Sequence, residues 1–237
     1  MKVGIMQPYF FPYIGYYSLI EQVDEFILLG NVQFIRHGWI ERNRILKPNE
    51  GWQYISVPLE KHSQQSAIDS ICIRNEERWK EKIYGQLTLY KWAPNYKKIM
   101  ELVKECIEPE QKSIMMLNKH VLEITCNYLE INTSIKLFSE MNLSIEQPNN
   151  ADEWALNICK AMSETVTEYW NPPGGKAFFD VSKYAKGNIN VKFQKMTDCI
   201  YKQGRRQEFE PWLSILDVMM FNDIATIKEM MNNFEII

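Results

Sequence analysis

The sequence predicts an α/β fold, and three observations carry this prediction. A short apolar run at residues 2–7 is followed by an aromatic turn, an amphipathic segment that ends near Val23 and a second apolar run at residues 26–29. This order of strand, turn, helix and strand is typical of the start of a βαβ unit. Strand-like and helix-like segments then alternate along the chain, and no repeat or linker-like change of composition interrupts its 237 residues. We therefore expect one α/β domain over residues 1–237, with a Rossmann-like nucleotide-binding core.

The first half of the chain divides into an opening unit and a helical section. The opening unit is expected over residues 1–60, because a run rich in β-forming residues at 53–57 ends at Pro58. A further short strand is expected at residues 70–73. Apolar residues then recur every three or four positions, which predicts an added helical section over about residues 76–130, with helices near 76–92, 96–106 and 112–128.

Strands and helices alternate again in the second half. We expect strands at residues 135–138, 165–170 and 190–194, and helices at residues 152–163, 214–222 and 226–233. Ser214 is the expected N-cap of the first closing helix, with Asp217 as its capping partner three residues on.

Composition excludes several classes of function. The net charge is −3 and basic residues are spread along the chain, so we expect no nucleic-acid partner. The five cysteines include no Cys-x-x-Cys pair, and no clustered histidines or carboxylates indicate a metal site. No apolar run reaches the roughly 20 residues of a membrane span, and the opening residues do not fit a signal peptide. The expectation is a cytoplasmic protein that does not bind membranes.

Polar and basic residues gather after the first strands. On βαβ sheets, ligands bind outside the carboxyl ends of the strands. The residues expected there are Gln7, Tyr9, Asn31, Gln33, Trp39, Arg42, Asn43 and Arg44. Two arginines with an amide between them, just past a strand end, suit phosphate or carboxylate oxygens, because a guanidinium is a planar fork of donors. The alternative is a solvated loop that forms surface ion pairs.

Two further segments are candidates for the site. In the loop at residues 171–176, Gly174 and Gly175 allow backbone amides to approach an anion and Lys176 adds charge, whereas the alternative is a plain turn. The glycine spacing is not that of a P-loop. His62, in a polar loop, is the candidate general base because histidine titrates near neutral pH, with an incidental loop histidine as the alternative.

The motifs resemble those of the WbqC-like family over essentially the whole chain. The resemblance lies in residues 6–16 (MQPYFFPYIGY), 32–34 (VQF) and 39–44 (WIERNR), and in a C-terminal signature region at 165–237 that includes residues 172–176 and 213–217. Members of this family are encoded among bacterial surface-polysaccharide genes, notably those for the O-antigen of lipopolysaccharide. The resemblance implies a transferase that acts on a nucleotide-linked sugar and places an amino-acid or acyl group on the nitrogen of an amino-deoxysugar.

The fold is also distantly similar to that of the nucleotidylyltransferases. Their His-x-Gly-His motif opens the first helix, where this chain has Tyr13-Ile14-Gly15-Tyr16. Tyrosine hydrogen-bonds a phosphate but does not supply the charge of an imidazolium at neutral pH. The similarity therefore implies a related fold and leaves adenylyl transfer in doubt.

Three functional hypotheses follow. In the first, an amide-forming transferase, Gln7, Tyr9, Asn31 and Gln33 orient the ligands, Arg42, Arg44 and Lys176 hold phosphates, and His62 accepts the proton of the attacking amine. The second is a nucleotidyltransferase-like enzyme that activates its substrate with ATP. The third is a non-catalytic protein that binds nucleotide-linked sugars. The cofactor stays open, with ATP and Mg²⁺ or an acyl thioester as alternatives, and a homo-oligomer is not excluded.

Overall fold

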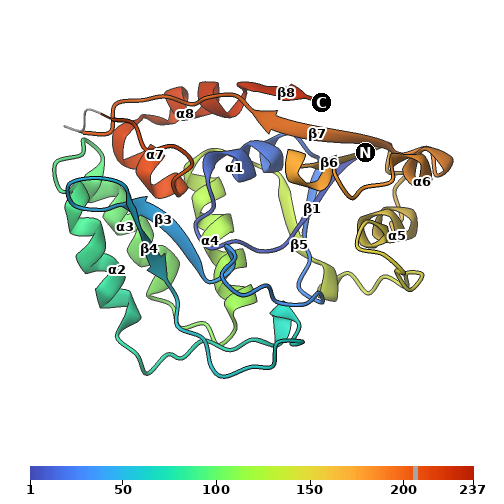
Figure 1. The fold of residues 1–237 in the computed structure, drawn as a ribbon, viewed down its shortest axis with the longest axis horizontal. Helices are drawn as coiled ribbons and strands as arrows, with labels where there is room; N and C mark the ends of the chain where they lie inside the picture. Colours follow the sequence, from blue (N-terminus) through green and yellow to red (C-terminus); the bar gives the residue numbers. More distant parts are fainter. Residues whose placement is uncertain (205–207) are drawn as a thin grey trace.

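A six-stranded, largely parallel sheet forms the centre of the molecule (Figure 1). The computed structural model describes residues 1–204 and 208–237. The strand order is β5-β2-β1-β6-β7-β8. Among the described residues of this sheet, only β8 pairs antiparallel with its neighbour, β7. The strands are β1 (Lys2–Met6), β2 (Glu25–Leu28), β5 (Ser134–Leu137), β6 (Glu168–Asn171), β7 (Asn190–Met196) and β8 (Phe234–Ile236). A separate antiparallel pair consists of β3 (Arg42–Leu46) and β4 (Trp52–Ser56).

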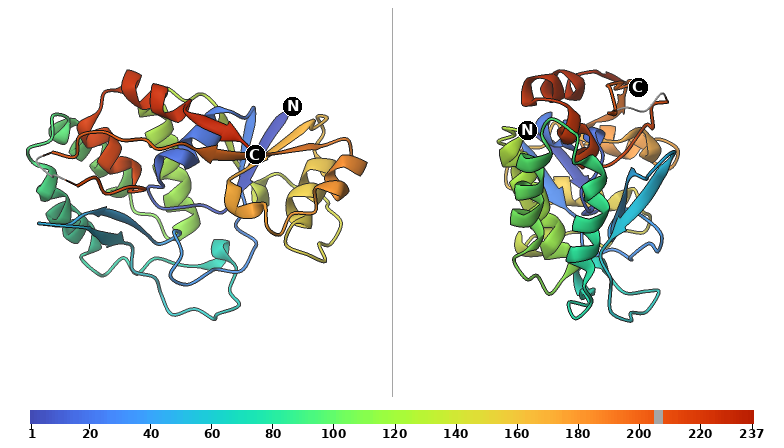
Figure 2. Two further views of the ribbon diagram at one scale, coloured as in Figure 1. Left: turned by 45° about the horizontal axis from the view of Figure 1, so that its top comes forward. Right: turned by 90° about the vertical axis from the view of Figure 1, so that its left-hand side faces the viewer.

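Helices cover both faces of the central sheet. They are α1 (Ile14–Glu21), α2 (Trp79–Leu87), α3 (Tyr96–Ile107), α4 (Ile114–Tyr128), α5 (Glu153–Ala161), α6 (Val181–Lys186), α7 (Ile215–Phe221) and α8 (Ile224–Met231). Figures 1 and 2 show α2, α3 and α4 on one side of the sheet and α5 and α6 on the other. Successive side chains of β2 alternate between two apolar cores, since Phe26 and Leu28 pack in the larger core and Ile27 in the smaller one. Of the helices described, none is long and apolar enough to cross a membrane.

The path of the chain reverses at the centre of the sheet. From β1 the chain moves outward to β2 and β5, returns to β6 on the other side of β1, and continues to β7. Both neighbours pair with β1 in parallel, with Val3 opposite Glu25 and Lys2 opposite Glu168. In open α/β sheets, such a reversal leaves a crevice at the carboxyl ends of the two central strands, where ligands bind. Here those ends are Met6 and Asn171.

Most of the expected elements are present. The opening βαβ unit is confirmed, because β1 and β2 are parallel neighbours joined through α1. The helical section is confirmed as α2, α3 and α4. The strand expected at residues 70–73 is wrong: a short 3-10 turn, Ile68–Ser70, is followed by isolated bridges from Cys72 and Ile73. The sequence analysis also missed β3, α6 and β8.

Two placements need correction. Arg42, Asn43 and Arg44 do not lie beyond a strand end; they form part of β3, where Arg42 pairs with Ser56 of β4. Ser214 caps α7 as expected, since its hydroxyl accepts from the Leu216 amide. Asp217 is not its capping partner, because its buried carboxylate accepts hydrogen bonds from Tyr90 (2.7 Å) and Tyr201 (2.5 Å) and the Ser214 amide donates to the Arg44 carbonyl.

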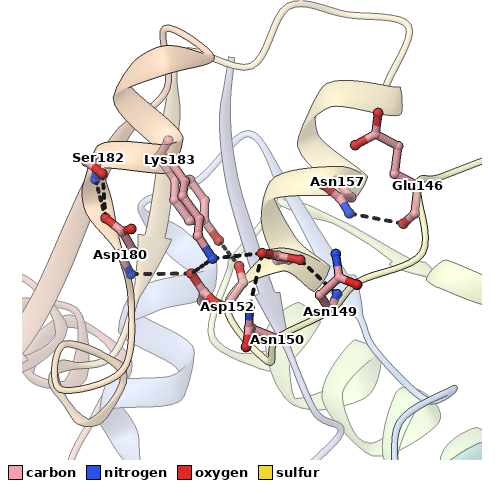
Figure 3. Close-up of polar contacts among 10 residues, drawn as sticks. Glu146, Asn149, Asn150, Asp152, Asn157, Asp180, Ser182 and Lys183 are labelled. Atoms are coloured by element: carbon pink, nitrogen blue, oxygen red, sulfur yellow. Dashed lines mark hydrogen bonds and ion pairs between the residues drawn. The ribbon is translucent and has the colours of Figure 1, made fainter.

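A network of charged contacts ties the start of α5 to α6 (Figure 3). Lys183 Nζ lies 2.7 Å from Glu153 Oε1 and 3.3 Å from Asp152 Oδ2. The hydrogen bond from Lys183 lowers the pKa of Glu153 to about 2, with the Asn149 amide as a second donor. Asp180 caps α6 by accepting from the Ser182 amide. These contacts fix α5 against the segment that follows β6.

Candidate functional site

A cleft of about 1030 Å³ opens at the carboxyl ends of β1 and β6. This volume is at the upper end of the range for small-molecule sites, and the lining is mainly apolar and aromatic with a few polar groups, as such sites usually are. Its walls come from the turn after β1, the loop before β3, the start of α5, the segment after β6 and Trp212. The cleft thus occupies the crevice that the strand order creates.

The aromatic turn after β1 is held rigidly through its backbone carbonyls. The carbonyl of Gln7 accepts from Tyr16 Oη, that of Pro8 from Asn118 Nδ2 and that of Phe10 from Asn43 Nδ2. The carbonyl of Phe11 accepts from Ser214 Oγ, that of Pro12 from the Ile215 amide and that of Tyr13 from the Tyr16 amide. These bonds hold Phe11 at a φ of 40°, which is uncommon for a residue other than glycine. Backbone strain of this kind persists only where the surrounding structure fixes it.

Two buried asparagines connect this turn to the rest of the site. Asn43 Nδ2 donates to the Phe10 carbonyl (3.1 Å), and its Oδ1 accepts from the Arg44 amide (2.8 Å). Asn118, from α4, donates to the carbonyls of both Pro8 (3.0 Å) and Ile40 (2.9 Å). Asn43 and Asn118 therefore fix the turn against the loop that carries Trp39.

Arg44 places a guanidinium in the wall of the cleft. Its Cζ lies 5.3 Å from the ring centre of Trp39 and 5.2 Å from that of Trp52, and Nη2 donates to the Trp212 carbonyl (3.0 Å). The other cation that lines the described part of the cleft, Lys195, pairs with Glu235 at 2.6 Å. Arg44 has no carboxylate partner among the described residues, so it is the cation best placed to receive an anionic ligand.

Comparisons with known proteins agree with the motifs in the sequence. The model of the WbqC-like protein family matches residues 7–229. The chain belongs to the WbqC-like family. It is also similar to the uncharacterized protein Rv1507c of Mycobacterium tuberculosis (strain ATCC 25618 / H37Rv), with 30% identity over 224 residues that cover 93% of each chain. No solved structure matches.

The cleft of this WbqC-like protein brings together most of the residues expected at the site. Those in its lining are Gln7, Tyr9, Gln33, Trp39, Asn43, Arg44, Gly174 and Gly175. Asn31, Arg42, His62 and Lys176 are not among the residues that line it. Their predicted roles, and those of the lining residues, stay predictions.

The residues outside the lining have clear local surroundings. The Arg42 guanidinium lies 4.1 Å from the ring centre of Tyr54 and donates to the carbonyls of His37 and Gly38. His62 Nδ1 is 2.8 Å from the Glu60 carbonyl, and its ring meets Phe34 edge to face. Lys176 is exposed just after the 3-10 turn Pro173–Gly175. Arg42 thus braces the loop before β3, a role that differs from that of Arg44.

Two tyrosines of the aromatic turn face the cleft as neutral donors. Burial raises the pKa of Tyr9, and burial with a further contribution from Tyr9 raises the pKa of Tyr13 to about 12. Both hydroxyls therefore keep their protons at neutral pH and can donate to a ligand oxygen. Tyr16, at the second position of the nucleotidylyltransferase-like motif, is buried and donates to the Gln7 carbonyl. Of these two motif positions, Tyr13 alone faces the cleft.

The sequence analysis missed several residues of the far wall and the rim. They are Trp154 on α5, Asn171 at the end of β6, Phe178 and Phe179 after it, Lys195 on β7 and Trp212. Asn171 carried a usable signal, since it precedes two prolines at the end of an expected strand, as Gln7 precedes Pro8 after β1. Phe178, Phe179 and Trp212 adjoin the motifs at residues 172–176 and 213–217, whereas Trp154 and Lys195 lie far from them in sequence and offered no signal.

Gly175 is expected to be sensitive to the smallest substitution. A Cβ at this position would lie 2.5 Å from Asn171 Oδ1 and 3.1 Å from the Phe179 ring, so Gly175→Ala must displace one wall of the cleft. Gly174→Ala is the matched control, because a Cβ there meets nothing within 4 Å. We expect Gly175→Ala to lower the thermal midpoint by several degrees, because overpacking at this position costs about 1–3 kcal/mol of folding free energy. Equal midpoints for the two variants, measured by calorimetry, would contradict this packing.

The lining does not supply the usual ligands of a magnesium nucleotide. Mg²⁺ is normally held by one or two protein carboxylates together with phosphate oxygens. No aspartate, glutamate or histidine lines the described cleft. Within residues 1–204 and 208–237, no group of three or more histidine, cysteine, aspartate or glutamate side chains could hold a metal ion. The residues present therefore fit a ligand that binds through hydrogen-bond donors and one guanidinium.

Proposed function

We propose that this protein is a cytoplasmic enzyme of bacterial surface-polysaccharide biosynthesis that binds a nucleotide-linked sugar in the cleft and acylates the amino group of that sugar. The position of the cleft carries the proposal. The cleft lies where the strand order reverses, which is the nucleotide-binding position of a Rossmann-like sheet. Membership of the WbqC-like family supports the link to polysaccharides such as the O-antigen.

The residues at the mouth of the cleft suit a diphosphate. The guanidinium of Arg44 offers a planar pair of donors to phosphate oxygens, and the indole of Trp39 shields it on one side. The neutral hydroxyls of Tyr9 and Tyr13 can donate to the same oxygens. The amides of Gln7 and Asn171, at the ends of β1 and β6, are placed to hydrogen-bond the sugar.

Amide formation on such a sugar needs little acid–base machinery from the protein when the acyl donor is a thioester. The amine nitrogen attacks the acyl carbon, the C–N bond forms, the C–S bond breaks, and the proton of the amine goes to solvent or to the leaving thiolate. The protein must orient the two reactants and donate hydrogen bonds to the carbonyl oxygen as it becomes negative. Gln7 and the two tyrosines are the donors that we assign to this task. His62, the base that the sequence suggested, lies outside the lining, so the proposal does not use it.

A non-catalytic nucleotide-sugar-binding protein is the second candidate. It is favoured by the lack of a histidine or carboxylate in the described lining. An ATP-activating enzyme has less support, because the described lining offers no carboxylate for Mg²⁺.

A ligand panel followed by a turnover assay tests the proposal. The purified protein is melted with nucleotide-linked sugars that do or do not carry an amino group, and separately with ATP and Mg²⁺. A ligand at a hundred times its Kd adds about 2.7 kcal/mol, which corresponds to a rise of about 5–10 °C for a chain of this size. We expect this rise with amino-sugar nucleotides, and an N-acylated product by mass spectrometry once an acyl thioester is added. Binding without product would favour the second candidate, and a rise with ATP and Mg²⁺ alone would contradict the proposal.

A further inference from the structure

The cleft has two unlike walls. The wall formed by the turn after β1 and the loop before β3 carries Arg44 and the tyrosine hydroxyls. The opposite wall, formed by α5 and residues 169–179, carries no charged side chain that lines the cleft. Its aromatic members are Trp154, Tyr169, Phe178 and Phe179. We call the part of the cleft along this wall, between α5 and Phe179, the apolar compartment.

The polar side-chain groups of the apolar compartment satisfy one another. Asn171 Nδ2 donates to Tyr169 Oη at 2.5 Å, and Tyr169 Oη lies 3.5 Å from the Ile5 carbonyl. Burial raises the pKa of Tyr169, so this hydroxyl is neutral. Asn171 Oδ1 lies against Gly175, and the rest of this wall is largely aromatic, an arrangement that favours an uncharged, apolar group.

The carboxylates at the start of α5 are paired with a lysine that lies outside the cleft lining. Asp152 and Glu153 stand at the start of α5, and both contact Lys183 of α6 (Figure 3). Neither lines the cleft. An ammonium group placed in the compartment would therefore lose its hydration without gaining a charged partner, which is costly.

The mouth of the compartment exposes large apolar side chains to solvent. Phe178 is 58% exposed, whereas its neighbour Phe179 stacks on Tyr169 with ring centres 5.7 Å apart. Ile35, on the other side of the mouth, is 59% exposed. Large apolar side chains exposed on both rims of one cleft mark a surface that a ligand covers.

We propose that the apolar compartment binds the acyl chain of the donor, so that the group transferred is a hydrocarbon acyl group of a few carbons and not an amino acid. This inference rests on the proposed function, because it names the donor of the same reaction. The sugar nucleotide then lies against Arg44, and its amino group meets the acyl carbonyl near Gln7 and Asn171.

Two isosteric thioesters test the choice between an acyl and an amino-acyl group. The acyl chain of butanoyl-coenzyme A ends in a methyl group, whereas that of β-alanyl-coenzyme A ends in an ammonium group. We expect calorimetry to show at least tenfold weaker binding of the β-alanyl thioester. Across acetyl-, butanoyl- and hexanoyl-coenzyme A, affinity is expected to rise about tenfold for each two methylenes, since each buried methylene contributes up to about fourfold. Tighter or equal binding of the β-alanyl thioester, a flat chain-length series, or no binding of any thioester at millimolar concentration would each overturn the inference.

Variants locate the effect and separate it from the proposed function. Phe178→Ser should flatten the chain-length series, whereas Trp92→Ser, which removes a 78% exposed aromatic side chain outside the cleft, should leave it unchanged. An equal response of the two variants would place the acyl chain elsewhere and overturn the assignment. Binding of amino-sugar nucleotides is measured in parallel. If they bind while the thioester series is flat, the donor inference alone fails; if none binds while the series holds, the proposed function fails instead.

Discussion

Asn118→Ala is expected to lower the free energy of unfolding by about 2–3 kcal/mol, the largest effect on stability that we predict. Asn118 is fully buried, and its Nδ2 supplies the donor for both the Pro8 and the Ile40 carbonyls. A buried acceptor that loses its donor costs about 1–3 kcal/mol. Asn118 Oδ1 has no hydrogen-bond partner in the described structure, so removing it relieves a small penalty. The expected loss of stability therefore lies toward the lower end of the summed cost for the two carbonyls.

Urea unfolding of both the variant and a control on the same helix measures this loss. Asn127→Ala is the control, because Asn127 is exposed on α4 and we expect a change within about 0.5 kcal/mol there. Asn118→Ala should also weaken the binding of a nucleotide-linked sugar, since the turn that carries Tyr9 and Tyr13 loses one of its fixed carbonyls. An equal loss of stability in both variants would show that the turn does not depend on these two bonds.

The parts of the fold that the sequence predicted are those with a regular apolar pattern. Strands β1 and β2 are short apolar runs, and the helices α2 to α4 bury side chains at helical spacing, so these patterns alone indicate them. Strand β3 was missed because three of its five residues are Arg42, Asn43 and Arg44. In the structure, the two guanidinium groups lie over aromatic rings and the asparagine is buried, which no polar–apolar pattern reveals.

The site residues that directly follow a strand in sequence could be predicted. Those whose role depends on partners far away in the sequence could not. Gln7, Tyr9 and Gly175 follow the ends of strands in sequence, and the cleft contains them. Asn118 looks like any helix asparagine, because the carbonyls that it holds are 110 and 78 residues away. Lys176 adjoins the two glycines in sequence, but the short 3-10 turn leaves it exposed and outside the lining.

Arg44→Met is expected to lower the affinity for a nucleotide-linked sugar about 10- to 100-fold. Hydrogen bonds to a charged group contribute about 1.5–3 kcal/mol, and Arg44 is the cation of the described lining without a carboxylate partner. Calorimetric titration of the folded variant measures the change. Arg78→Met is the control, since Arg78 is highly exposed and pairs with Glu81 away from the cleft. Arg44→Lys should fall between the wild type and the methionine variant, because it keeps the charge and loses the planar fork.

The same titration on Arg42→Met separates the two arginines that the sequence presented as a pair. The Arg42 guanidinium already donates to the carbonyls of His37 and Gly38 and lies against Tyr54. Its loss should therefore lower stability and change affinity less than threefold, whereas the loss of Arg44 acts mainly on affinity. If both variants lost affinity equally, the anion site would include both guanidinium groups, and Arg42 would have to leave its carbonyl partners when the ligand binds.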